Sequence, residues 1–125
     1  MSTTTIPTGI NLTILIGTLS RPPELRSLPS GDTVLALELT LRIDGSPTES
    51  VPVSWFDPPP GATGWEEGEK LLVTGRTRRR FFRAGGVTQS RTEVVASTAI
   101  PVRRAAAVRK ALRVAIDPVE RATSG

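Results

Sequence analysis

The chain has 125 residues, a net charge of +4 and 38% hydrophobic residues, a length that suits one globular domain with a core but not two ordinary ones. It contains neither cysteine nor histidine, which excludes disulfides, Cys or His zinc sites and Ser-His or Cys-His catalysis. No apolar run reaches the length of a signal peptide or a membrane span, so we expect a cytoplasmic protein without a membrane partner.

Charge is divided unevenly along the chain. Residues 1–69 carry three arginines against nine acids, whereas residues 70–125 carry thirteen basic residues against three acids. Fourteen of the sixteen basic residues are arginine, a side chain that suits phosphate contacts and stacking. The concentrated positive segment indicates a polyanionic partner, and the arginine content favours nucleic acid.

Strand patterns dominate the first hundred residues. Residues 1–8 are rich in Ser and Thr and are expected to be flexible. Residues 21–32 hold several prolines and a Ser-Gly pair, which predicts loop and turn. Alternating or β-branched sequence predicts five strands, at residues 9–20, 35–42, 48–56, 70–83 and 87–100.

The remaining segments predict little regular structure apart from one helix. The triple proline after Asp57 makes a long helix improbable before the fourth strand, and Trp65 in that loop is expected to plug the bottom of a barrel. After residue 101 the sequence becomes rich in Arg and Ala, which predicts a short helix that Pro118 ends.

Five strands with a long loop between the third and fourth predict an all-β fold. The OB-fold, a five-stranded antiparallel Greek-key barrel, fits this pattern, although SH3-like barrels and small sandwiches fit the strand pattern as well. We therefore expect a flexible N-terminus at residues 1–8, a binding domain at 9–101, and a basic C-terminal helix and tail at 102–125.

The strongest candidate for a binding site is Arg76–Arg83, in which five arginines flank two phenylalanines. Arginines contact phosphates, and rings stack on bases for about 1–3 kcal/mol per base. The period-two rule places alternate residues of this strand on one face, and Arg42 and Phe56 fall on the matching faces of their strands. The residues predicted to bind nucleic acid are Arg42, Phe56, Arg76, Arg78, Arg79, Arg80, Phe82, Arg83 and Arg91.

Other interpretations of the charged and aromatic residues remain open. The arginines could simply protect an exposed hairpin from aggregation, and Phe81 could be a core or subunit contact. A second basic cluster, Arg103–Arg113, suggests a solvated helix or tail, with DNA contact or packing on a neighbouring subunit as alternatives. The adjacent acids at Glu66–Glu69 suggest a solvated turn, so we expect no metal, no cofactor and no enzymatic activity.

Several segments resemble the bacterial single-stranded-DNA-binding proteins (SSB) in order and spacing. These are Asn11–Leu19, Pro23–Arg26, Pro29–Val34, Glu67–Arg76 and Thr92–Ala96. The resemblance implies an OB-fold, a homotetramer of dimers paired through the first strand, and nucleoid-associated binding of single strands with little sequence preference in replication, recombination or repair. It also implies stacking roles for Phe56 and Phe82.

The sequence departs from the family pattern in three places. Two further stacking tryptophans have no counterpart, because Gly45 and Ser50 stand near their positions, and residues 57–61 replace a helix. The last residues are not an acidic tip, so we expect a short paralogue that does not recruit repair and replication enzymes through one. With fewer rings, arginine should carry more of the binding, which predicts a steep salt dependence.

Three other function classes compete with this interpretation. The first is an OB-fold protein-interaction subunit of a primosome-like assembly with weak DNA contact. The second is an RNA-binding OB module, since stacking and phosphate contacts suit both kinds of strand. An enzyme is the most distant, because the chain lacks His, Cys and paired buried acids.

Overall fold

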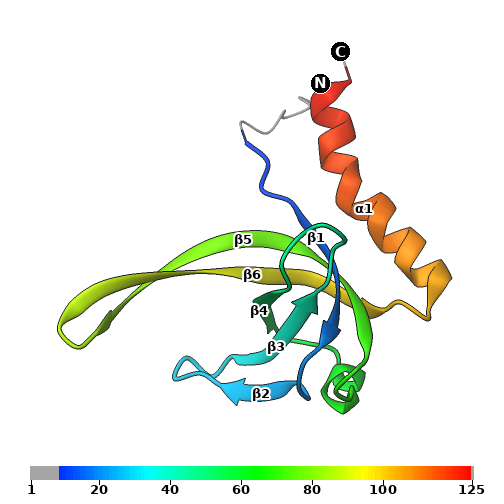
Figure 1. Cartoon of the computed structure of the whole chain (residues 1–125). Coiled ribbons are helices and arrows are strands. Elements are labelled where there is room, and N and C mark those ends of the chain that lie inside the picture. The colour runs from blue at the N-terminus through cyan, green and yellow to red at the C-terminus, as the bar shows by residue number, and fades with distance from the viewer. Residues whose placement is uncertain (1–8, 125) are drawn as a thin grey trace.

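The computed structural model describes residues 9–124, in which six strands and a C-terminal helix are joined by short loops (Figure 1). The N-terminal segment 1–8, expected to be flexible, lies outside the described residues. The elements are β1 (Thr13–Leu19), β2 (Glu24–Ser27), β3 (Thr33–Leu41), β4 (Glu49–Phe56), the 3₁₀ helix η1 (Pro60–Gly64), β5 (Lys70–Ala84), β6 (Val87–Pro101) and α1 (Ala105–Thr123).

The strands close into a barrel. Their order is β1-β5-β6-β4-β3-β2, and β1 returns to pair with β3 at Thr18↔Thr40, which closes the sheet. All pairings are antiparallel except a short parallel one between β4 and β6, at Val53↔Val94 and Ser54↔Val95. The predicted OB-fold class is confirmed, with one parallel pairing where a wholly antiparallel barrel was expected.

The core follows the alternation seen in the sequence. Leu35, Leu37 and Leu39 of β3 are buried, and their cross-strand neighbours on β4 include Trp55 and Val53. Because successive side chains of a strand point to opposite faces, the intervening residues form an outer face. The barrel interior is therefore apolar, while the other side of β3 and β4 is free for polar chemistry.

Trp65 packs against the end of this core, as expected from the sequence. Its ring stacks on Trp55 with centroids 6.0 Å apart and an interplanar angle of 20°. The loop between β4 and β5 contains only the five-residue η1, whose Ala62 is buried beside the tryptophans. The prolines thus prevent a long helix, and the two indoles close the barrel in its place.

The strands β5 and β6 are each fifteen residues long and extend well beyond the barrel. Their barrel half, Lys70–Thr77 with Glu93–Pro101, contributes to the core, whereas every residue from Arg79 to Thr92 is exposed. We call the projecting ribbon, Arg78–Ala84 with Val87–Thr92, the arm; it is the long two-stranded extension in Figure 1. The register shifts at Thr74/Gly75, on the barrel side of the arm.

Two segments differ from the sequence-based expectation. Residues 21–32 were expected to be loop, but Glu24–Ser27 forms β2 and pairs with β3 over four residues. All four are exposed, so β2 carries no buried alternation from which a strand could be predicted.

The C-terminal helix is longer than predicted. It continues through Pro118 to Thr123 instead of ending at the proline. A proline removes one intrahelical hydrogen bond, while the flanking Ala, Val, Glu and Arg residues tolerate or favour helix. No helix of residues 9–124 is long and apolar enough to cross a membrane.

Candidate nucleic-acid interface

The outer face of β3 and β4 forms the floor of the candidate site. Val34 pairs with Phe56 and Ala36 pairs with Ser54, and these side chains lie opposite the core residues of the same strands. Because the side chains of Ala36 and Ser54 are small, the middle of this face is hollowed. β2 borders it on one side, and β5 and β6 lie across the other.

A buried carboxylate joins three strands at this face. Glu93 of β6 accepts hydrogen bonds from Ser54 Oγ of β4 at 3.1 Å and from Arg78 Nε of β5 at 3.1 Å. Its side chain is only 6% exposed, whereas that of Arg78 is 33% exposed. The Arg78 guanidinium also lies 5.7 Å from the centre of the Phe56 ring, within cation–π range. Arg78 is therefore fixed by its partners and positions Phe56.

The protonation of Glu93 follows from these contacts. Burial on its own would raise the pKa of the Glu93 carboxyl, but the hydrogen bonds from Arg78 and Ser54 and the Arg78 charge outweigh it. The pKa of Glu93 is thus held below its usual value. At neutral pH the residue is a carboxylate that neutralises Arg78.

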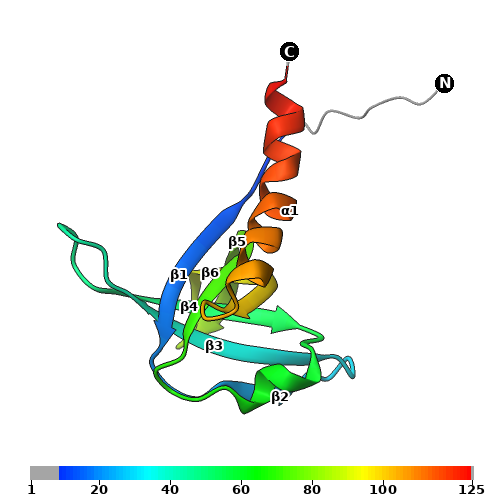
Figure 2. The same ribbon diagram turned by 90° about the vertical axis from the view of Figure 1, so that its right-hand side faces the viewer.

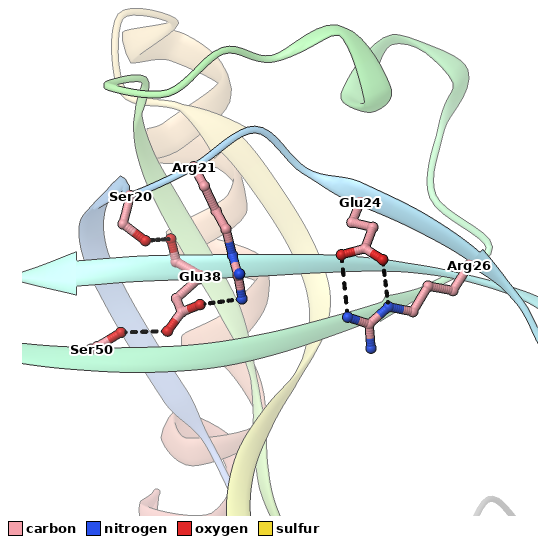
Figure 3. Close-up of polar contacts among 6 residues, drawn as sticks. All are labelled: Ser20, Arg21, Glu24, Arg26, Glu38 and Ser50. Carbon is pink, nitrogen blue, oxygen red and sulfur yellow. Dashed lines mark hydrogen bonds and ion pairs between the residues drawn. The ribbon is translucent and has the colours of Figure 1, made fainter.

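Two further acids on this side of the barrel are paired as well, as Figure 3 shows. Glu38 accepts hydrogen bonds from Ser50 Oγ at 2.7 Å and from the Arg21 guanidinium. The hydrogen bond from Ser50 is the main cause that lowers the pKa of Glu38. Glu24 forms an ion pair with Arg26 at 3.3 Å. Each acid on this face therefore has an arginine partner.

Three adjoining hollows run across this face onto the arm, and together we call them the outer-face groove. The largest, of about 600 Å³, lies between β2–β4 and the base of the arm and includes Phe56 and Phe81. A smaller one of about 120 Å³ lies beside Glu38, and a third of about 200 Å³ lies along the arm. The first two share Arg26 and Arg80, so the groove is continuous.

The arm itself contains no acid, and its only acidic neighbours within residues 9–124 are those of the small hollow, where Arg80 lies near Glu93 and Arg91 near Glu38. Residues 78–92 contain five arginines and no Asp or Glu, and only Arg78 forms an ion pair within the described chain. Arg80 lies directly opposite Arg91 in the β5–β6 register, and both border the hollow that contains Phe82. Like charges opposite each other destabilise a β ribbon, and a bound anion relieves that repulsion.

Most of the residues predicted to bind nucleic acid meet in this groove. Its lining or edge includes Phe56, Arg78, Arg79, Arg80, Phe82 and Arg91. Arg83 is near the end of the arm, where it donates a hydrogen bond to the Gly86 carbonyl at 3.0 Å. Phe81 is not a core residue, since it is 68% exposed and lies in the groove.

Two predicted residues lie elsewhere. Arg42 follows the end of β3 in the loop to β4 and lines none of the three hollows. Arg76 lines a separate groove beside α1. The sequence interpretation missed Arg21 and Arg26, which belong to a segment predicted as loop although both border the outer-face groove. The only sequence signal was the SSB-like block Pro23–Arg26, which contains Arg26.

No group of three or more acids within residues 9–124 lies close enough together to hold a metal ion.

The chain was compared with known proteins by sequence and by structure. No model of a known protein family matches the sequence, and no curated protein matches it. The crystal structure of the wild-type single-stranded DNA binding protein from Thermus aquaticus matches with a TM-score of 0.60 and 28% sequence identity. The match covers 74% of this chain and 40% of the Thermus chain, so the chain spans about two fifths of that protein. The resemblance to the SSB family is therefore confirmed, and the chain is similar to this SSB and shares its OB-fold.

Proposed function

We propose that the chain binds single-stranded DNA with little sequence preference, through the outer-face groove and the arm of residues 9–101. The observation that carries the proposal is the arm, where Arg80 faces Arg91 beside Phe82 with no acid within residues 78–92. Such a surface attracts a polyanion and offers a ring to a base. The Thermus neighbour, named as a single-stranded DNA binding protein, supports the same conclusion.

Binding divides between two kinds of group. Arg79, Arg80, Arg83 and Arg91 form no ion pair within residues 9–124, so they are free to hold phosphates and release counterions. The exposed edges of Phe56, Phe81 and Phe82 offer flat surfaces to bases. Rings accept any base because every base has a π-face, which explains low sequence preference.

The paired acids make the small hollow less positive than the rest of the arm. Glu24, Glu38 and Glu93 lie beside the small hollow of the groove, each next to its arginine. Phosphates avoid carboxylates, so the backbone follows the uncompensated arginines, and the bases turn toward the rings. A duplex keeps its bases stacked inside and gains only the phosphate contacts.

We further propose that copies associate through the edge of β1. β1 pairs with β5 along Thr13–Thr18 but with β3 only at its last two residues, which leaves its other edge open over most of its length in the described structure. Ile14 and Ile16 are 38% and 54% exposed on this strand. An open apolar edge strand invites pairing with a second copy, and two such dimers give the homotetramer.

The physiological role that fits these properties is protection of single strands exposed at the nucleoid in replication, recombination or repair. A labelled dT oligonucleotide tests the activity by fluorescence anisotropy at low and moderate salt, with a duplex of equal length as control. Saturable binding to the single strand that weakens steeply with salt, and much weaker duplex binding, is expected. Equal affinity for both, or no dependence on salt, would reject the proposal.

A protein-interaction subunit is the second candidate, favoured by one observation. No residue of α1 is buried, although its side chains include Val108, Leu112, Ile116 and Val119. Tight association with another protein, together with no DNA binding at low salt, would favour this alternative.

A further inference from the structure

A second groove, of about 530 Å³, lies between α1 and the barrel, and we call it the α1 groove. Figure 2 shows the helix rising beside β1 and β5, and the helix also contacts β6. On the helix side the wall includes three small residues one turn apart, Ala107, Ala111 and Ala115, together with Val114 and Pro118. These side chains are too short to fill the space between the helix and the sheet, so an apolar slot remains.

The edges of this slot are positively charged. Arg76 reaches it from β5 and Lys110 from α1, so a cation lies on each wall. None of the fourteen residues that line the slot is acidic, and neither cation forms an ion pair within residues 9–124. The slot therefore combines an apolar interior with two uncompensated cations, which is the chemistry that a nucleotide requires.

The sheet wall is firmly positioned and offers polar edges. Asn11 donates to the Thr77 carbonyl at 2.8 Å and accepts from the Thr77 amide at 3.0 Å, which fixes the start of β1 against β5. Ser97 and Thr98 add hydroxyl groups to the same wall. A hydroxyl both donates and accepts, so it can meet the edge of any base.

Strand β5 connects the α1 groove to the arm. Arg76 and Arg78 are alternate residues of β5, about 7 Å apart along the strand, and Arg78 marks the base of the outer-face groove. A strand bound on the arm can therefore continue to Arg76. This path leads from the outer-face groove directly to the slot.

We propose that the α1 groove takes one nucleotide of the strand that leaves the arm. The base enters the space between the alanines and the sheet, while Arg76 and Lys110 hold the flanking phosphates. The inference rests on the proposed function and extends the binding path from the barrel to α1. Its volume falls in the range of small-ligand sites.

The test compares two single-charge variants on the same helix. Lys110→Ala removes the cation in the slot, and Arg113→Ala removes a cation that lies one turn on and does not line it. Each is titrated with a short dT oligonucleotide that covers only the outer-face groove and with a longer one. Lys110→Ala should reduce the slope of log affinity against log salt concentration by about 0.7, and only for the longer oligonucleotide. Arg113→Ala should bind both as the unmodified chain does.

A third variant, Ala111→Trp, fills the slot without changing charge, and circular dichroism checks that it folds. It should weaken binding of the longer oligonucleotide several-fold and leave the short one unchanged. Equal behaviour of Lys110→Ala and Arg113→Ala would overturn the inference while leaving the proposed function intact. A changed oligomeric state of Ala111→Trp with unchanged DNA affinity would also overturn it, since the slot would then hold a second copy. If the unmodified chain binds neither oligonucleotide, the proposed function fails as well.

Discussion

The two halves of the β5–β6 pair differ in the burial of their side chains. In the barrel half, Leu71, Val73 and Val94 are buried in the core, and Gly75 lies against the Val95 carbonyl. In the arm, the same ladder continues through Arg80↔Arg91 and Phe82↔Gln89, and every side chain beyond Arg78 is exposed. Backbone pairing therefore extends the sheet, while the core ends at the base of the arm.

This difference separates residues that packing constrains from residues that it leaves free for binding. A side chain in the barrel half must fit its neighbours, so its identity is determined by packing. A side chain on the arm has no core to fit, and its identity is free for charge and stacking. Arg78 and Glu93 stand at the boundary and belong to both regions, because the pair links three strands and borders the groove. The predictions below separate the two regions.

The largest effect is expected when the arm loses its uncompensated charge. Changing Arg79, Arg80, Arg83 and Arg91 to Ala should remove four phosphate contacts. The slope of log affinity for dT against log salt concentration should then fall by about 2.8, and the affinity at 0.1 M salt should fall several hundred-fold. The unfolding temperature should not fall, since all four are exposed and the change also removes the repulsion between Arg80 and Arg91. Anisotropy titrations and calorimetry measure the two properties.

The matched control removes the same formal charge from arginines at the start of α1 and along it. Arg104, Arg109, Arg113 and Arg121, which do not line either groove, are changed to Ala. If both quadruple variants lose affinity equally, net charge and not the arm controls binding, and the comparison between the two regions fails.

A single methyl group should disrupt the barrel half. A Cβ at Gly75 would lie 2.1 Å from the Val95 carbonyl oxygen, so Gly75→Ala must push β5 and β6 apart. We expect the free energy of unfolding to fall by about 3 kcal/mol or more, as in overpacked cores. Urea denaturation measures this, with Gly64→Ala as the control, because no atom lies within 4 Å of the added Cβ there. Equal stability of the two variants would contradict the close approach of the strands.

A ring on the arm should affect binding but not stability. Phe82→Ala removes a stacking surface and should weaken dT binding by about 1–3 kcal/mol, with no change in unfolding temperature. Phe82→Trp should retain affinity. Val87→Ala, an exposed apolar residue of the same ribbon, should have no effect on binding. Weakening by Val87→Ala to the same extent would indicate that general apolar contact, and not stacking, operates on the arm.

The boundary pair should appear in the pH dependence of stability. The folded pKa of Glu93 lies below its unfolded value, so the pair stabilises the fold at neutral pH and loses this contribution as pH falls through the folded pKa. Glu93→Gln should therefore cost about 1–2 kcal/mol at pH 7 and progressively less in acid. Urea denaturation from pH 7 to pH 3 measures the difference, and Glu120→Gln, an exposed residue of α1, is the control. A constant difference across this pH range would show that Glu93 contributes by packing alone.

The sequence was most informative where packing determines the residue. Alternation in Leu35, Leu37 and Leu39 predicted both β3 and the face it buries. The same rule placed Phe56 and Arg78 on a common outer face, and the two are in contact. β2 could not be predicted in this way, because its four residues are exposed and only its pairing with β3 makes it a strand.

The sequence was less informative for residues whose location depends on the path of the folded chain. Arg76 shares the period-two face of Arg78, but the register shift at Thr74/Gly75 and the twist of the long strands turn it toward α1. Arg42 lies one residue beyond the end of β3, where alternation no longer applies. The role of Glu93 depends on Ser54 and Arg78, which are distant in sequence and meet only in the folded barrel.

The central claim is that one half of β5–β6 supports the fold and the other half binds the strand. Hydrogen exchange of the backbone amides, with and without a saturating dT oligonucleotide, tests this claim most directly. Without DNA, amides of the barrel half should exchange slowly and those of residues 78–92 quickly, because a bare two-stranded ribbon is marginally stable. With DNA, exchange should slow in residues 78–92 and at β4 residues 54–56, and change little in residues 70–75. Unchanged exchange in the arm at saturation, or slowing confined to surfaces away from both grooves, would contradict the account.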